Sequence, residues 1–276
     1  MHMTFMNDAW HEGNAPILGA MDHAVWLGSS IFDGARSIRG RLPDLRLHLA
    51  RATRSAELLG LNCPYTIEQM EQLCRDGITK FPADAELYIR PLIFGTEGLL
   101  IPSQSGFALT LFDAPLPAFA GFSSCLSTLQ RPNPLMAPTD AKASCLYPNT
   151  TRALRDAKAR GYDNAVVCDI QGHVAEFATA NLFFVDQAGQ VVTPVANGCF
   201  LSGITRARVI GLLATQKIKV EERSVHPDEL LDAQEIFNTG NFGKVLPCTR
   251  YENQDFPIGP IATLARKLYL GFMETE

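Results

Sequence analysis

The sequence predicts a mixed α/β protein of two domains, and three observations support this prediction. Its 276 residues suit two domains, or one large one. The first half places two helical patterns ahead of two strand patterns, which is typical of an α+β unit. The second half alternates hairpins with helices, and a proline- and alanine-rich stretch at 113–122 separates it from the first. We therefore expect one domain at residues 1–114, a linker at 115–122 and a second domain at 123–276.

Two amphipathic helices are predicted in the first domain. Apolar residues recur at steps of four and three over residues 45–59, and Gly60 supplies the stop. Thr66 opens the second helix, with Gln69 three residues later completing a capping box. Strands are expected at 87–94 and 107–112, and the first 26 residues show only short strand patterns.

The second domain shows three helices and two hairpins. Turn residues at Gln171-Gly172 and at 186–189 each lie between apolar runs, so each predicts a hairpin. Helices are expected at about 149–160, 204–217 and 261–273, with one helical turn at 227–231 before a strand at 235–238.

Composition excludes several classes of protein. Hydrophobic residues make up 46% and charged residues 19%, which is unlike a disordered chain. The 24 basic and 29 acidic residues form no runs, and no apolar stretch approaches a membrane span, so neither nucleic acid nor membrane is an expected partner. Seven cysteines without a C-x-x-C pair and six scattered histidines predict neither a disulfide framework nor a metal site. With no secretory signal pattern, we expect a cytoplasmic enzyme acting on small molecules.

Nucleotide-binding and hydrolase motifs are absent from the sequence. Neither G-x-G-x-x-G nor G-x-x-x-x-G-K-[ST] occurs, which removes the main support for a nucleotide fold. The G-x-S-x-G elbow of α/β-hydrolases is also missing.

Lysine is scarce, and one of the seven lysines has unusual neighbours. Five lie among charges at predicted helix ends and are expected at the surface: Lys80, Lys158, Lys217, Lys219 and Lys267. Lys142 is surrounded by small and apolar residues, which favour the lowered pKa that a Schiff-base nucleophile needs. Lys244, in the run Gly240–Lys244, is the rival candidate, and a lysine that reaches solvent from a strand is the structural alternative.

Five motifs in register resemble one enzyme family. They are the run Phe32–Arg36, His48-x-x-Arg51, the strand Tyr88–Phe94, Lys142-x-x-x-x-Tyr147 followed by Glu176 in Val174–Phe183, and Gly203-Ile204-Thr205-Arg206. Together they resemble fold-type IV pyridoxal-phosphate enzymes, above all branched-chain amino acid aminotransferases, and this resemblance covers about residues 20–273. The resemblance implies a small N-terminal α/β domain, a larger C-terminal pseudo-barrel domain that binds pyridoxal 5'-phosphate, and a homodimer.

The resemblance also implies a role for each matching residue. Lys142 would carry the cofactor as a Schiff base and move the proton, and Glu176 would pair with the pyridinium nitrogen. Tyr147 would bond the phenolic oxygen of the cofactor. The phosphate would be held by Arg51, by the N-terminus of a helix at Ile204 and Thr205, and by Asn241. Without the family register, a surface glutamate, a core tyrosine, an exposed arginine and an ordinary helix start are the alternatives.

Three positions depart from the branched-chain enzymes, and two of them lie around the substrate. Leu27 stands where those enzymes have a pocket tyrosine, and Ala114 falls near a position often held by a tryptophan. Asn241 replaces a phosphate-binding threonine, although an asparagine amide can still donate. Phe32, Tyr88 and Arg90 complete the expected substrate pocket, the last two matching residues near the substrate carboxylate.

These departures leave the substrate open. Loss of the pocket tyrosine slightly favours an (R)-selective amine transaminase that passes the amino group to pyruvate by a ping-pong mechanism. Tyr88 and Arg90 keep branched-chain amino acid (2-oxoglutarate acceptor) and D-amino acid transamination open. A lyase resembling aminodeoxychorismate lyase and a non-catalytic cofactor-binding protein are the alternatives from other classes.

Overall fold

The computed structural model describes residues 1–276, which fold into two compact units. The first comprises Met1–Leu116, Ala141–Leu146 and Glu276, and the second comprises Pro117–Asp140 and Tyr147–Thr275. The segment Ala141–Leu146 lies within the range expected for the second domain. It belongs to the first unit instead, because Ala143 forms a bridge with Ile31 of that unit.

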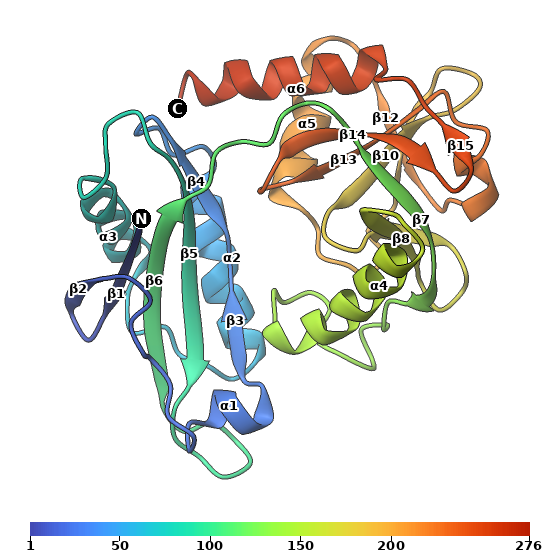
Figure 1. The fold of residues 1–276 in the computed structure, drawn as a ribbon. Helices are drawn as coiled ribbons and strands as arrows, with labels where there is room; N and C mark the ends of the chain where they lie inside the picture. Colours follow the sequence, from blue (N-terminus) through green and yellow to red (C-terminus); the bar gives the residue numbers. More distant parts are fainter. The chain divides into compact units, whose positions relative to one another are not determined.

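The first unit is built on a six-stranded antiparallel sheet (Figure 1). Its strands are β1 (His2–Met6), β2 (Ala9–Glu12), β3 (Ser30–Phe32), β4 (Ala35–Ile38), β5 (Glu86–Gly95) and β6 (Ser105–Asp113). The order across the sheet is β2-β1-β6-β5-β3, and β4 also pairs with β5. The two predicted strands are confirmed as β5 and β6, which are the longest of this sheet and pair with each other along their length.

Two helices cover one face of this sheet. They are α2 (Leu45–Leu58), which contacts β5, and α3 (Ile67–Ile78), which contacts β6. Both predicted helices are confirmed, and the capping box of Thr66 and Gln69 is present at the start of α3. The apolar sides of α2 and α3 and the alternate residues Leu87, Ile89 and Ile93 of β5 form one core. Residues between these on β5 therefore point to the opposite face of the sheet.

The sequence did not reveal helix α1 or strand β4. Helix α1 (His23–Leu27) has five residues, which is too short to show a helical period, and it ends at Gly28 with φ +71°. Strand β4 has four buried residues, one of them an arginine, so it lacks the alternation of a half-buried strand.

The second unit is built on a nine-stranded mixed sheet. Its strands are β7 (Phe122–Gln130), β8 (Asn164–Cys168), β9 (Val174–Phe177), β10 (Asn181–Val185), β11 (Val191–Pro194), β12 (Val220–Arg223), β13 (Glu235–Gly240), β14 (Lys244–Tyr251) and β15 (Gln254–Asp255). The order is β12-β11-β10-β13-β14-β7-β8-β9, with β15 beside β14. Three neighbouring pairs are parallel, namely β11 with β12, β14 with β7, and β7 with β8. Strand β9, at the end of the order, also contacts β10 and β11, so the sheet curls back on itself as a pseudo-barrel.

Helices and turns of the second unit agree closely with the sequence patterns. They are α4 (Tyr147–Ala159) against β7 and β8, α5 (Ile204–Thr215) against β13, α6 (Pro260–Met273) against β14, and the short 3-10 helix η2 (Pro227–Leu230). A further 3-10 helix, η1 (Ser144–Leu146), lies in the segment Ala141–Leu146 of the first unit and contacts β3. Both predicted hairpins are confirmed as β8–β9 and β10–β11. None of the helices is long and apolar enough to pass through a membrane.

Strand β14 was not predicted, because Pro247 interrupts its pattern. Proline cannot donate a ladder hydrogen bond, so it is expected at positions without a second strand neighbour. The structure meets this condition, since Pro247 pairs with β13 while β7 joins β14 only from Cys248 onward.

Candidate active site

The backbone of Lys142 is fixed within the first unit. Its N–H donates to Ser55 Oγ on α2 at 3.0 Å, and its carbonyl accepts from the Phe32 N–H on β3 at 3.2 Å. The next residue, Ala143, forms a bridge with Ile31. Lys142 is half-buried, and its neighbours Ala141 and Ala143 are fully buried, so its side chain is attached to a closely packed segment of backbone.

The ammonium of Lys142 and the guanidinium of Arg90 both lie near one aromatic ring. The Nζ atom of Lys142 lies 5.0 Å from the centroid of the Phe32 ring, and Arg90 Cζ lies 6.0 Å from the same centroid. The same Cζ atom of Arg90 lies 5.5 Å from the centroid of the Tyr88 ring and 5.2 Å from the centroid of the Phe112 ring. The structure thus brings four of the predicted site residues together on this unit.

Tyr88 is held in this group by close packing on both sides. Its ring stacks on Phe112 at 5.3 Å with an interplanar angle of 25°. On the other side lies Gly34, where a Cβ atom would stand 1.9 Å from the Tyr88 hydroxyl oxygen. Any side chain at position 34 would displace the Tyr88 ring, which explains the glycine in the run Phe32–Arg36.

Arg51 is buried on α2 and pairs with Asp33. The carboxylate accepts from Arg51 Nε at 2.7 Å and from Nη2 at 2.8 Å, and it lies 2.8 Å from His48 Nδ1. Ser55, which holds the Lys142 backbone, follows Arg51 by one helical turn and therefore lies on the same side of α2. The helix places the predicted phosphate-binding arginine and the contact to the predicted catalytic lysine in consecutive turns.

Burial alone would raise the pKa of Asp33. The charge and hydrogen bonds of Arg51, together with His48, outweigh this effect and hold the pKa well below its usual range. Neither Asp33 nor Ser55 was assigned a role from the sequence, although Asp33 lies within a family motif.

We expect Asp33→Asn to lower the free energy of unfolding by about 3–5 kcal/mol, because it leaves the Arg51 charge buried without its carboxylate. Urea denaturation at pH 7 measures this loss, and Asp84→Asn, at an exposed position, is the control. The folded-state pKa is depressed, so the stabilisation is present above the unfolded-state value of about 4 and is lost as the pH falls below it. The difference between wild type and variant should therefore narrow below about pH 4. A constant difference down to pH 2 would contradict this account.

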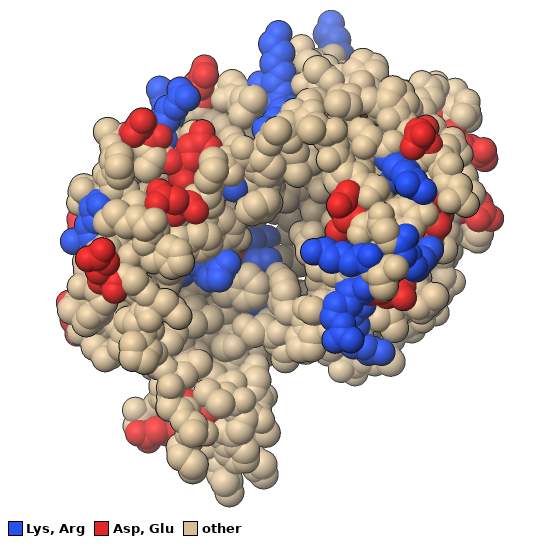
Figure 2. Space-filling model, in the orientation of Figure 1, with Lys and Arg blue, Asp and Glu red and all other residues tan.

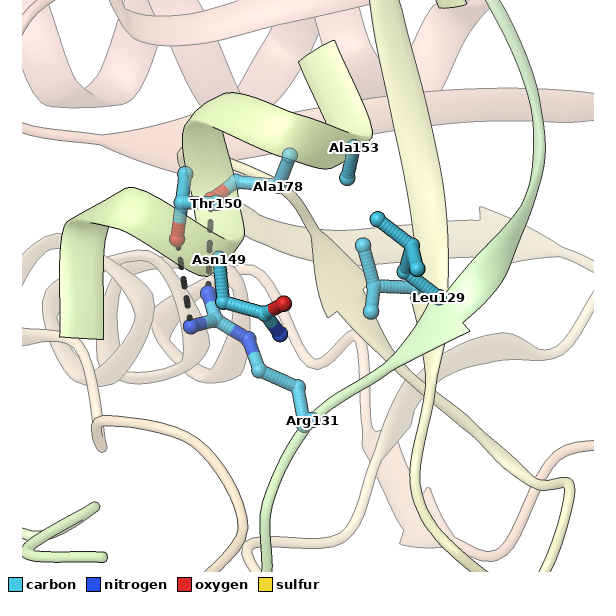
Figure 3. A pocket seen from close by; sticks show the side chains of 7 residues that line it. Leu129, Arg131, Asn149, Thr150, Ala153 and Ala178 are labelled. Carbon is cyan, nitrogen blue, oxygen red and sulfur yellow. Dashed lines mark hydrogen bonds between the residues drawn. The ribbon is translucent and has the colours of Figure 1, made fainter. Parts of the chain in front are cut away.

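Glu176 lies on β9 in the second unit and is 5% exposed. Its Oε1 accepts from Arg131 Nη2, and its Oε2 accepts from Asn181 Nδ2 at 3.1 Å. The Arg131 guanidinium also reaches the hydroxyl of Thr150 at 3.5 Å and the carbonyl of Ala178 at 3.3 Å (Figure 3). The carboxylate is therefore oriented by donors from two different elements, and the ordering role of Arg131 was not predicted from the sequence.

The start of α5 lies against Asn181. The Asn181 amide donates to the Leu201 carbonyl at 3.2 Å, and a Cβ atom at Gly203 would stand 2.0 Å from Asn181 Oδ1. Gly203 is the N-cap of α5 and provides no side-chain cap, so Ile204 and the buried Thr205 begin a helix whose first N–H groups carry partial positive charge.

A buried hydroxyl lies directly across the sheet from Asn181. Thr239 on β13 pairs in register with Asn181, so the two side chains share one face. Thr239 is fully buried, and its Oγ1 has no hydrogen-bond partner within the chain. A buried polar atom without a partner is uncommon, and a bound polar group is one explanation for it. This hydroxyl, together with the start of α5, suits an anionic group.

The two remaining cofactor residues also lie in the second unit. Tyr147 begins α4 and is half-buried. Asn241 lies in the turn between β13 and β14, where its Oδ1 accepts from Lys244 Nζ at 2.6 Å. Lys244, the rival lysine, is 1% exposed, whereas the five lysines expected at the surface are confirmed as exposed.

The two substituted substrate positions lie in the first unit. Leu27 ends α1 and is 43% exposed; the next residue, Gly28, packs against Cys145, three residues after Lys142. Ala114 is buried, and its carbonyl accepts from Arg36, whose guanidinium lies 5.9 Å from the ring of Tyr88.

Two hollows in the second unit are unsuitable for the predicted chemistry. One cavity of about 10 Å³ beside Arg131 is lined by apolar atoms and has room for about one water molecule (Figure 3). A shallow groove along α4 is lined by Thr128, Leu129, Arg152, Arg155, Asp156 and Ala159. In Figure 2, basic side chains gather in the region of α4 with acidic ones among them, as on an ordinary solvated surface.

Comparison with known proteins assigns the family. The family described as amino-transferase class IV matches residues 30–251. The chain is 34% identical to a probable branched-chain-amino-acid aminotransferase of Rickettsia bellii over 226 residues, which cover 80% of this chain and 77% of the relative. An aminotransferase from Brucella abortus bound to the co-factor PLP shares 43% identity and a TM-score of 0.97 over 99% of both chains. The branched-chain amino acid aminotransferase of Escherichia coli shares 26% identity and a TM-score of 0.91 over 98% of this chain and 93% of that one. The fold and these matches confirm the resemblance to fold-type IV, and the chain belongs to the class IV aminotransferases, a family of pyridoxal-phosphate-dependent transaminases.

Proposed function

We propose that the enzyme transfers the amino group of an amino acid with an apolar side chain to a 2-oxo acid. The observation that supports this most directly is the group formed by Lys142, Phe32, Tyr88 and Arg90 in the first unit. Its aromatic rings suit an apolar side chain, and its exposed guanidinium suits a carboxylate. The relatives named for branched-chain amino acids support the same substrate class.

The residues of the chain fit pyridoxal phosphate as a cofactor. Arg51, Thr205 and Asn241 would hold the phosphate, and the unpartnered Thr239 hydroxyl lies on the same face as Asn181 near the start of α5. Glu176 would face the pyridine nitrogen, Tyr147 would donate to the phenolic oxygen, and Lys142 would bind the cofactor covalently. When bound, the cofactor supplies an electron sink for the negative charge left on the substrate carbon.

Each side chain then has one task in the reaction. The Nζ atom of Lys142, once neutral, would take the proton from the substrate α-carbon and would deliver it to the C4′ carbon of the cofactor. Glu176 would hold a proton on the pyridine nitrogen, and Arg131 and Asn181 keep its carboxylate in one orientation. Arg90 orients the substrate carboxylate, while Phe32 and Tyr88 exclude water from one side of Lys142.

A second substrate class is supported by Leu27. A leucine in place of the pocket tyrosine removes a hydroxyl and leaves an apolar wall, which suits an (R)-amine without a carboxylate and pyruvate as acceptor. A donor screen distinguishes the two proposals. Its donors are both enantiomers of 1-phenylethylamine, together with L-leucine and D-alanine, and each donor is tested with pyruvate and with 2-oxoglutarate as acceptor. Turnover of (R)-1-phenylethylamine with no turnover of L-leucine would overturn the first. Release of pyruvate from a donor without any transfer of its amino group to the cofactor would indicate a lyase instead.

We expect Arg90→Met to raise the KM for L-leucine about 100-fold, because the substrate carboxylate loses its charged partner. The KM for 1-phenylethylamine, which has no carboxylate, should stay within about twofold of wild type if that amine is a substrate. Steady-state kinetics of both donors measure the difference, with Arg41→Met at an exposed position of the same unit as the control. An unchanged KM for L-leucine would remove Arg90 from the substrate site.

We propose further that the enzyme is a cytoplasmic homodimer. Large apolar side chains are exposed on α1, in the turn before it and on the adjoining loop between β5 and β6, at Met21, Val25, Trp26, Leu99, Leu100 and Ile101. A patch of this kind marks an interaction surface, and a second copy of the chain is the partner that the family implies. All seven cysteines are free, which suits a reducing compartment. Light scattering should give the mass of two chains, and a single-chain mass would contradict the dimer; cell fractionation tests the location.

A further inference from the structure

Lys244 is a buried lysine that the proposed reaction does not use. It is 1% exposed at the first position of β14, with a φ of +61° that side chains other than glycine rarely adopt. Its Nζ donates to Asn241 Oδ1 at 2.6 Å and lies 5.1 Å from the centroid of the Tyr269 ring on α6. Burying an ammonium is costly, so a specific contact of this kind calls for an explanation.

The contact determines which way the Asn241 amide points. An asparagine side chain has an accepting oxygen at one end and a donating NH2 group at the other, whereas an ammonium can only donate. Asn241 must therefore turn its oxygen toward Lys244, since the flipped amide would set N–H groups against the ammonium. Its Nδ2 donors are directed away from Lys244 as a consequence.

The turn that carries both residues is held by α6. Arg266 Nη1 donates to the carbonyls of Gly243 at 2.7 Å and of Val245 at 2.9 Å, the residues on either side of Lys244. A Cβ atom at Gly243 would stand 2.5 Å from Leu246, so the turn is also closely packed. The lysine and the amide thus meet on a fixed backbone.

The neighbouring strand end points to a ligand independently of this pair. Thr239, two residues before Asn241, is fully buried and its Oγ1 has no hydrogen-bond partner within the chain. It pairs across the sheet with Asn181, whose side chain contacts the start of α5. The turn therefore lies next to the start of α5, which suits an anionic group.

We propose that Lys244 is a positioning residue that orients the Asn241 amide so that Nδ2 donates to the cofactor phosphate. The proposal rests on the proposed placement of the phosphate at Asn241 and the start of α5. A threonine hydroxyl rotates and can donate without help, whereas an amide must be turned the right way round. The ammonium supplies that orientation, and its charge also polarises the amide toward stronger donation.

The test compares pyridoxal phosphate with phosphate-free pyridoxal as ligands of the full-length chain. We expect Lys244→Met to weaken the affinity for pyridoxal phosphate about tenfold and to leave that for pyridoxal within about twofold. In an Asn241→Thr background, where the donor needs no orientation, Lys244→Met should change the affinity for pyridoxal phosphate by less than about twofold. Equal weakening for both ligands, or an undiminished loss in the Asn241→Thr background, would show that Lys244 is only structural.

Asn241→Asp keeps the test decisive if Lys244→Met does not fold. The aspartate pairs with the Lys244 ammonium but has no donor, so we expect the affinity for pyridoxal phosphate to fall at least tenfold with little change for pyridoxal. Unchanged affinity for pyridoxal phosphate would overturn the proposal.

Thr205→Ala separates this proposal from the proposed phosphate site. It should weaken only pyridoxal phosphate, whether or not Lys244 is present. Loss with Thr205→Ala but none with Lys244→Met would overturn the role of Lys244 alone. No loss with either would show that the phosphate binds elsewhere, which would overturn both.

Discussion

Lys142→Ala is expected to abolish transamination, lowering kcat by about 10⁴-fold or more, because the variant lacks both the covalent attachment point and the group that moves the proton. The visible absorbance of the bound cofactor should change at the same time, since the cofactor is no longer linked to the chain. The fold should be retained, because the contacts of the segment with Ser55 and Phe32 use backbone atoms of Lys142. Kinetics, absorbance spectra and circular dichroism on the same preparation measure the three effects.

Lys158→Ala is the matched control for this variant. Lys158 is exposed on α4, so its removal should leave kcat and the absorbance spectrum unchanged. Near wild-type turnover by Lys142→Ala would show that Lys142 is not the catalytic lysine, and Lys244 would then be the next candidate.

Glu176→Gln is expected to lower kcat by about 10²–10⁴-fold while the cofactor stays bound. Glutamine keeps the size of the side chain but loses the negative charge that holds a proton on the pyridine nitrogen. It also turns an NH2 group toward either Arg131 or Asn181, both of which donate to the native carboxylate. Single-turnover kinetics with L-leucine measure the slowed chemical step directly.

The control for Glu176→Gln is Glu57→Gln, at an exposed position of α2. That substitution should change neither cofactor content nor kcat. Full activity of Glu176→Gln would mean that another group faces the pyridine nitrogen.

The regular elements were largely predictable from the sequence, because each leaves a local signal. The capping box at Thr66, the apolar steps of α2 and the turn residues of the β8–β9 hairpin all act within a few residues. Helix α1 and strand β14 were missed for local reasons too, since one is too short and Pro247 interrupts the other.

The candidate site was predictable only in part, because its order depends on contacts distant in sequence. Arg131 lies 45 residues from Glu176, and Ser55 lies 87 residues from Lys142. No spacing in the sequence predicts such pairs of residues. The packing of Gly34 against Tyr88 likewise becomes visible only when β4 and β5 are paired. The sequence motifs therefore identified residues of the chemistry, whereas the fold identified the residues that orient them.

The most direct test of the account is to locate the cofactor on the chain. Borohydride reduction of the holoenzyme fixes pyridoxal phosphate to the lysine that carries it, and peptide mass spectrometry identifies that lysine. We predict a phosphopyridoxyl group on Lys142 and on no other residue. A label on Lys244, or a holoenzyme that acquires no label, would contradict the assignment of Lys142 as the catalytic lysine.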